Sequence, residues 1–262
     1  MKTISLFNSK GGTGKTTFSV HLAAGLAMAG KSVVLIDADS QGNSTTALSL
    51  PKKPNFYDLI VRGGDWRDCL SAVHPDVYSD ERVQGQLFVV NGNVETGNIP
   101  NSIDDETIIM QRLQEIESAV DYVIFDTSPT ASLLHSAIHA ATDYLILPTQ
   151  LEGHSALEGL PESMARAESM RSRAARYGLD VCNVLGIVPN MHKRNTITHD
   201  GVLDHIRSEY GELVWEPVSS RIVIPEANLA KQLVYRYAPK SDSANDFINI
   251  TNRVLHSIEV PA

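Results

Sequence analysis

Short apolar runs alternate with amphipathic segments along most of the chain. Apolar runs of four or five residues, each of which predicts a strand, occupy residues 4–7, 32–36, 87–90, 122–125, 144–147 and 184–188. Segments with apolar positions at helical spacing occupy residues 18–29, 107–120, 133–141, 156–177, 196–210 and 242–258. The run 32–36 is too uniformly apolar to have one wet face, which is typical of a parallel strand covered on both sides. The pattern therefore predicts a doubly wound α/β fold, a mostly parallel sheet with helices on both faces.

The length and composition fit one globular domain over residues 1–262. A chain of 262 residues with 42% hydrophobic and 20% charged residues can bury a large core without disulfides. Cys69 and Cys182 are far apart and are expected to be buried or half-buried thiols of a reducing cytosol. No apolar run is long enough to span a bilayer and no leader precedes the first strand, so we expect a cytoplasmic protein with no membrane partner. Residues 49–85 are irregular and rich in proline and glycine, which predicts loops around short helices.

A glycine-rich segment follows the first predicted strand and precedes the first predicted helix. It reads Lys-Gly-Gly-Thr-Gly-Lys-Thr-Thr over residues 10–17. Its three glycines let the backbone curl so that successive N–H groups point inward, and the helix start adds its positive end. Lys15 then reaches the β- and γ-phosphates of a nucleotide, and the Thr16 hydroxyl binds Mg²⁺. A plain glycine-rich turn would not account for the strand–loop–helix context that this chemistry needs.

The first lysine of this segment is the unusual one. An ordinary P-loop needs only Lys15, so Lys10 points either back to the phosphates of its own subunit or out toward a nucleotide held by a facing copy. With this residue the segment resembles the ParA/MinD family, whose deviant Walker A motif reads KGGxGKT[ST], and the match is complete over residues 10–17. The resemblance implies a P-loop NTPase fold in which Lys10 crosses a dimer interface to the ATP of the partner. It spans nearly the whole chain, because residues 224–241 also resemble the family's C-terminal pattern.

Two further segments place carboxylates at the ends of predicted strands. Residues 37–43 read Asp-Ala-Asp-Ser-Gln-Gly-Asn, and Asp126 ends a hydrophobic run in a Walker B pattern. Taken alone, the first segment is more simply a polar turn. In the family that the chain resembles, it is the second signature, usually DxDPQGN, which implies that Asp39 positions the hydrolytic water and that Asp37 lies near the metal. Ser40 stands here in place of the usual proline, which removes a constraint on φ.

The resemblance extends to the nucleotide base and to the reaction. Asn190 matches the asparagine that reads the adenine edge, although an asparagine after a strand is also typical of a turn, and Pro217 is expected to wall the base. The implied cofactors are ATP and Mg²⁺, and turnover is expected to be slow because no arginine finger or glutamine of the faster GTPases is evident. The expected catalytic residues are Lys10, Lys15 and Asp39. The expected nucleotide-binding residues are Gly11, Gly12, Thr13, Gly14, Lys15, Thr16, Thr17, Asn190 and Pro217, and the expected metal site comprises Thr16, Asp37 and Asp126.

The overall charge of the chain bears on nucleic-acid binding. A net charge of −9 argues against attraction of DNA to the molecule as a whole, so DNA binding needs a local patch. On the helix predicted at 156–177, Arg166, Arg173 and Arg176 fall within about 80° of arc. A solvated face is an equally good interpretation, since Glu162 lies four residues before Arg166 and can neutralise it. The resemblance implies a DNA surface formed largely by C-terminal basic residues of a dimer. The candidate DNA-binding residues are Arg166, Arg173, Arg194, Arg221, Lys231 and Arg236.

The sequence leaves three functions open. The favoured one is a ParA-type ATPase, which forms an ATP-dependent sandwich homodimer, binds nonspecific double-stranded DNA on the nucleoid, and partitions a plasmid, chromosome or other cargo until a ParB-like adaptor stimulates hydrolysis. The alternative is a MinD-like membrane-surface ATPase, which needs a C-terminal amphipathic helix rich in lysine or arginine. Residues 246–258 contain only one such residue, Arg253. The third is a metabolic enzyme on the same fold, and the reductases among these need paired cluster cysteines that Cys69 and Cys182 do not resemble.

Overall fold

A seven-stranded sheet organises the chain. The computed structural model describes residues 1–176, 178–193 and 195–259, with the backbone alone for residues 153–155. Its strand order is β3-β4-β2-β5-β1-β6-β7, and neighbouring strands are parallel except for β3 with β4. The strands are β1 (Lys2–Leu6), β2 (Ser32–Ala38), β3 (Leu70–Ala72), β4 (Gln86–Val90), β5 (Tyr122–Thr127), β6 (Tyr144–Gln150) and β7 (Asn183–Asn190).

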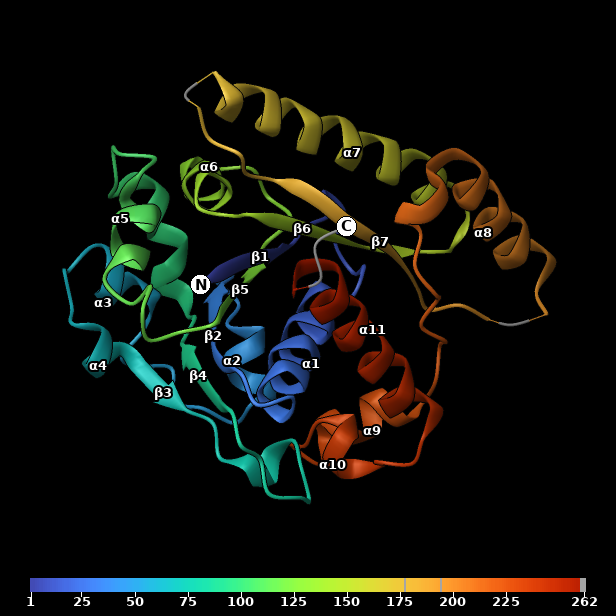
Figure 1. The fold of residues 1–262 in the computed structure, drawn as a ribbon, viewed down its shortest axis with the longest axis horizontal. Coiled ribbons are helices and arrows are strands. Elements are labelled where there is room, and N and C mark those ends of the chain that lie inside the picture. The colour runs from blue at the N-terminus through green and yellow to red at the C-terminus, as the bar shows by residue number, and fades with distance from the viewer. Residues whose placement is uncertain (177, 194, 260–262) are drawn as a thin grey trace.

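Helices cover both faces of this sheet (Figure 1). The α-helices are α1 (Lys15–Met28), α2 (Asn43–Ala47), α3 (Phe56–Ile60), α4 (Trp66–Cys69), α5 (Ile108–Gln114), α6 (Leu133–Ala140), α7 (Gly153–Ala175), α8 (Ile197–Tyr210), α9 (Val223–Leu229), α10 (Val234–Tyr237) and α11 (Asp242–Glu259). Three 3₁₀ helices, η1 (Pro75–Val77), η2 (Val94–Asn101) and η3 (Gly211–Leu213), lie in the connections. Helix α1 packs on one face with α9, α10 and α11, whereas α5, α6 and α7 lie on the opposite face.

Successive residues of the central strands supply these two faces. Val33 and Leu35 of β2 belong to the core that includes α1 and α11, whereas Val34 and Ile36 belong to the core that includes α5 and α6. All four side chains are at most 1% exposed. This explains why the strand reads as an uninterrupted apolar run, because neither of its faces meets water.

The doubly wound α/β fold predicted from the sequence is confirmed, and all six predicted strands are present. The sequence did not predict β3, a three-residue antiparallel strand at the edge of the sheet. Helix α5 ends at Gln114, short of residue 120, because the chain continues from there in tight turns. Cys69 and Cys182 are buried free thiols, as expected. Within the described residues, no helix combines the length and hydrophobicity that crossing a bilayer requires.

Candidate nucleotide site

The loop between β1 and α1 forms a cradle at the carboxyl end of the sheet. Gly12 and Gly14 have φ values of +76° and +95°, in the left-handed region that glycine tolerates. Gly14 is the N-cap of α1, so this helix opens with its unpaired N–H groups at the cradle. A Cβ atom at residue 14 would lie 2.3 Å from Nδ2 of Asn190, which leaves no room for a side chain. The backbone is therefore shaped to receive an anion such as a phosphate.

Lys15 lies within this cradle and not in solvent. Its Nζ donates to the carbonyl oxygens of Asn8 at 3.2 Å and Lys10 at 3.1 Å, and the residue is 6% exposed. Burial lowers the pKa of the Lys15 ammonium, while the carboxylates of Asp126 and Asp39 raise it. An ammonium group has three donors, so one remains for a ligand. Phosphate binding by Lys15 stays a prediction, for which this donor is available.

Two carboxylates meet on neighbouring strands beside the cradle. Asp37 of β2 lies opposite Asp126 of β5 in the strand register, and both residues are fully buried. Asp126 accepts hydrogen bonds from the hydroxyls of Ser19 at 3.2 Å and Ser44 at 2.8 Å, and the Thr16 hydroxyl also stabilises it. Burial raises the pKa of Asp126 in spite of these donors. The predicted proximity of Thr16 and Asp126 is therefore present.

The two carboxylate oxygens of Asp37 differ in their hydrogen bonding. Its Oδ2 accepts from the backbone nitrogen of Thr45 at 2.8 Å and from the Thr45 hydroxyl at 2.7 Å. Its Oδ1 is buried and has no donor among the described residues. Burial, and then the charge of Asp126, raise the pKa of Asp37 to about 7. A hard divalent cation prefers oxygen ligands and would relieve the repulsion between the carboxylates, so Thr16, Asp37 and Asp126 fit a Mg²⁺ site.

Asp39 lies in the loop that follows β2. It is half-buried, its Oδ1 accepts from the backbone nitrogen of Gln41 at 2.9 Å, and its charge acts on Lys15. The loop rests on η2, because a Cβ atom at Gly97 would lie 3.3 Å from the Cβ of Ser40. Packing against η2 therefore supports Ser40, the position at which the resemblance led us to expect a proline.

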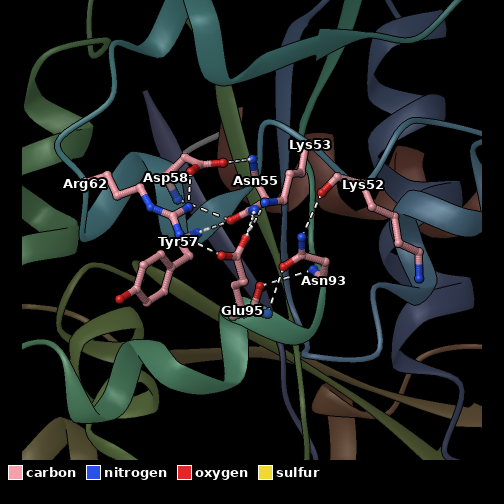
Figure 2. Close-up of polar contacts among 9 residues, drawn as sticks. Lys52, Lys53, Asn55, Tyr57, Asp58, Arg62, Asn93 and Glu95 are labelled. Atoms are coloured by element: carbon pink, nitrogen blue, oxygen red, sulfur yellow. Dashed lines mark hydrogen bonds and ion pairs between the residues drawn. The ribbon is translucent and has the colours of Figure 1, made fainter.

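A polar network holds η2 in place behind this loop (Figure 2). Glu95 lies at its centre, where it accepts from Arg62 at 2.7 Å and Asn55 at 2.8 Å and pairs with Lys53 at 3.3 Å. Arg62 also pairs with Asp58. These donors, Arg62 first, lower the pKa of Glu95 to about 2. Sequence reasoning missed this network, because its members come from two irregular segments that no motif marks.

Lys10 lies against helix α7. Its Nζ is 3.0 Å from Oε2 of Glu162, and its stem passes so close to Gly159 that a Cβ atom there would lie 2.9 Å from the Lys10 Cγ. One residue earlier, the backbone nitrogen of Ser9 donates to the Ser163 hydroxyl at 3.2 Å. This is a third orientation for Lys10, different from the two considered from sequence. Glu162 thus contacts Lys10, whereas the sequence suggested that it would neutralise Arg166.

Asn190, at the end of β7, contacts the cradle, whereas Pro217 lies in the segment after η3. The Asn190 Nδ2 donates to the carbonyl oxygen of Thr13 at 2.8 Å, and its Oδ1 accepts from the backbone nitrogen of Met191 at 2.8 Å. Asn190 is 6% exposed. Pro217 lines a cavity of about 290 Å³ with Trp215. The structure thus brings Asn190 to the P-loop and leaves its adenine contact as a prediction.

The candidate DNA-binding cations do not gather in one patch of the protomer. Arg166 and Arg173 lie on α7, whereas Lys231 and Arg236 lie at α9 and α10 on the opposite side of the sheet (Figure 1). Lys231 is exposed and Arg236 is half-buried. Arg194 lies outside the described residues.

Two of these cations already have carboxylate partners. Arg221 pairs with Asp242 at 3.0 Å and Asp246 at 3.2 Å, and Arg173 pairs with Glu106 at 2.8 Å. Their net contribution to an electrostatic attraction for phosphate is reduced accordingly.

Known proteins are similar to this chain in sequence and in fold. A family model described as an AAA domain matches residues 1–179. The sporulation initiation inhibitor protein Soj of Bacillus subtilis is 29% identical over 257 residues, which cover 97% of this chain and 98% of that protein. The chromosome-partitioning ATPase Soj of Thermus thermophilus is 30% identical over 261 residues, which cover 99% and 97%. Among solved structures, the Cyanothece McdA(D38A)–ATP complex has a TM-score of 0.79 and 19% identity and covers 100% of this chain and 98% of its own.

Proposed function

The chain belongs to the ParA/MinD family of deviant Walker A ATPases, and we propose that it works as a ParA-type switch whose ATP-bound dimer positions a cargo on DNA. It is an ATP-hydrolysing P-loop enzyme that uses ATP and Mg²⁺. We treat residues 1–262 as one ATPase domain. The observation that carries the proposal is the complete signature at residues 10–17, folded as a cradle with both Lys10 and Lys15 beside it.

The residues around the cradle divide the chemistry between them. Lys15 and the N–H groups at the start of α1 bind the phosphates. Thr16, Asp37 and Asp126 hold Mg²⁺, which supplies positive charge next to the phosphates. Asp39 orients the attacking water, since it lies at the loop end of β2 with its carboxylate half-exposed. With no arginine finger evident among the residues that the structure describes, catalysis depends on positioning and on the charge of the two lysines, which suits slow turnover.

Dimerisation is the step that we assign to Lys10. In the protomer its ammonium is held by Glu162 of the same chain. We propose that ATP binding in two facing protomers draws each Lys10 away from Glu162 and toward the nucleotide of the partner. The side chains of Lys10 and Glu162 are 44% and 56% exposed, so breaking this ion pair costs little free energy.

The ATP-bound dimer is proposed to bind nonspecific double-stranded DNA through basic residues near the C-terminus. Lys231 and Arg236 are the candidates best placed for this, because they lie on the same side of the sheet as α11 and no ion pair of the described residues includes them. A ParB-like adaptor would then stimulate hydrolysis and release the dimer. The MinD-like alternative has less support, since Phe247, Ile250 and Val254 of α11 are buried in the core and not displayed for a membrane.

The test compares three proteins by sedimentation, DNA gel shift, phosphate release and ATP binding. Wild-type protein with Mg²⁺ and a slowly hydrolysed ATP analogue should run as a dimer in sedimentation and should shift random-sequence DNA in a gel. Asp39→Ala should keep both properties with ATP and lose phosphate release, because it removes only the group that orients water. Lys10→Ala should bind ATP but remain monomeric. A dimer of normal affinity for Lys10→Ala, or wild-type turnover for Asp39→Ala, would contradict the proposal.

A further inference from the structure

A second cavity lies between α6 and α7 and shares no residue with the nucleotide site. Its volume is about 730 Å³, within the range of about 300–1,000 Å³ that small-molecule sites occupy. Apolar side chains from α7 and from the segment before β7 form part of its wall, among them Met170, Leu179 and Val181. Hydroxyl groups of Ser132 and Ser136 add polar positions at α6. We call it the α6–α7 cavity.

The α6–α7 cavity carries an excess of positive charge. Arg166 is half-buried, its guanidinium carbon lies 5.6 Å from the centre of the Phe7 ring, and no carboxylate of the described residues forms an ion pair with it. Arg173 also lines the cavity and pairs with Glu106 at 2.8 Å. The wall thus brings together two guanidinium groups and one carboxylate. Arg166 therefore presents a positive charge to the cavity that no carboxylate of the described residues neutralises.

Two histidines of α6 line the same wall and remain neutral. Burial is the largest cause that lowers the pKa of His139, to about 3, and that of His135 below its usual value; the charge of Arg166 lowers both further. His135 is fixed by hydrogen bonds from its Nε2 to the carbonyl oxygen of Ser128 at 2.7 Å and between its Nδ1 and the Ser132 hydroxyl at 3.0 Å. His139 Nε2 is buried and has no partner among the described residues. The histidines therefore add no charge of their own, and the arginines decide the sign of the potential.

We propose that the α6–α7 cavity binds a small amphipathic anion. Its carboxylate or phosphate group would pair with Arg166 and Arg173, since guanidinium groups recognise such oxyanions in bidentate fashion. Its apolar or aromatic body would lie against Met170, Leu179 and Val181. This site is separate from the cradle, and the proposal does not depend on how the protein uses DNA.

Anilinonaphthalene sulfonate is a suitable probe, because it joins an anionic group to an aromatic body and its fluorescence rises on binding. The titration is run with saturating Mg²⁺ and ADP so that the nucleotide site is closed to it. The wild-type protein should bind one probe per chain. The double variant Arg166→Gln/Arg173→Gln should bind about tenfold more weakly, as expected for the loss of charge-assisted contacts.

A matched control is available on the same helix segment. Arg171→Gln/Arg176→Gln removes the same two charges from positions that do not line the cavity, and it should bind the probe as the wild type does. The uncharged analogue phenylnaphthylamine should bind the wild type more weakly than the sulfonate does. No saturable binding, equal losses in the two double variants, or equal affinity for the uncharged analogue would each overturn the proposal.

Discussion

Gly14 occupies a position that no other residue fits. Its φ of +95° is strained for any residue with a Cβ atom, and that atom would lie 2.3 Å from Nδ2 of Asn190. Gly14→Ala should therefore destabilise the protein by about 2–4 kcal/mol, from backbone strain and overpacking together. Gly11→Ala is the matched control, since a Cβ atom at residue 11 meets nothing within 4 Å. Urea unfolding of both variants measures the difference.

A double variant at Gly14 and Asn190 separates the steric clash between these two residues from the strain of the Gly14 backbone. In an Asn190→Ala background the side chain that meets the new methyl group is shortened, so Gly14→Ala should cost about 1–2 kcal/mol less there than in the wild type. The strain of the left-handed backbone would remain. Equal losses in both backgrounds would show that Asn190 does not pack against the P-loop as described.

If ATP draws Lys10 to the partner subunit as proposed, Glu162 sets how readily Lys10 leaves its own subunit. The ion pair of 3.0 Å is half-exposed, and such pairs contribute about 0–1 kcal/mol. Each dimer would break two such pairs, one in each protomer, so Glu162→Gln should strengthen the ATP-dependent dimer by up to about 30-fold, as measured by sedimentation over a range of protein concentrations. Glu168→Gln, on the same helix but bonded to Ser172, should leave the dimer unchanged. A weaker dimer for Glu162→Gln would show that Glu162 helps Lys10 at the interface.

The motif predicted the backbone of the P-loop and the start of α1 but not the directions of the side chains. The backbone conformation of residues 10–17 is determined locally, by the glycines and by the start of a helix. The contact of Lys10 with Glu162 joins residues 152 positions apart (162 − 10), and the network around Glu95 joins segments that are irregular in sequence. Nothing in local spacing specifies such partners. They follow only from how the elements pack.

At the scale of elements, contacts of His21 connect α1 with the C-terminal helices α10 and α11. Its Nδ1 donates to the carbonyl oxygen of Thr17 at 2.7 Å, its Nε2 accepts from the backbone nitrogen of Val234 at 3.2 Å, and its ring stacks on Phe247 with centres 4.2 Å apart. Burial lowers the pKa of His21 from 6.5 to about 4. The neutral ring is thus built into the junction of α1, α10 and α11.

This junction predicts a loss of stability in acid. The unfolded chain takes up the proton near pH 6.5 and the folded chain near pH 4, so the stabilisation is complete above pH 6.5 and is lost as the pH falls toward 4. The loss amounts to about 3 kcal/mol for this group. His21→Gln should be less stable than the wild type at pH 7, and the difference should shrink by pH 4.5 in urea unfolding. Asn252→Gln, at an exposed position of α11, changes no titratable group, so its difference from the wild type should not change with pH.

The alternation of elements was predictable because strands covered on both faces are apolar throughout. Strand β3 could not be found in this way, since its three residues lie at the edge of the sheet and are only partly buried. The α6–α7 cavity was equally hidden. Arg166 and Arg173 follow helical spacing and read as a solvated or DNA-binding face, and their position beside α6 depends on how α7 lies across the sheet.

At the scale of the whole molecule, DNA binding must overcome an unfavourable charge. Two protomers of −9 carry −18 together (2 × −9), so any attraction to DNA comes from local contacts with phosphates. If the dimer contacts about six phosphates, the logarithm of its binding constant should fall with the logarithm of the salt concentration at a slope of about −5. A response that does not change with salt would contradict an electrostatic surface.

A substitution at the proposed DNA-binding surface should change this slope in proportion to the number of cations removed. Lys231→Gln removes a cation from each protomer and hence two from the dimer, so the slope should become less steep by about 2, with a uniform loss of affinity across DNA sequences. Arg67→Gln makes the same change of charge on α4, which lies away from α9 and α10 (Figure 1), and should leave the slope as it is. Fluorescence anisotropy of a labelled random duplex, with the ATP analogue present, gives both slopes. If Arg67→Gln lowered the slope as much as Lys231→Gln, the attraction would arise from total charge, and the C-terminal residues would have no special part in it.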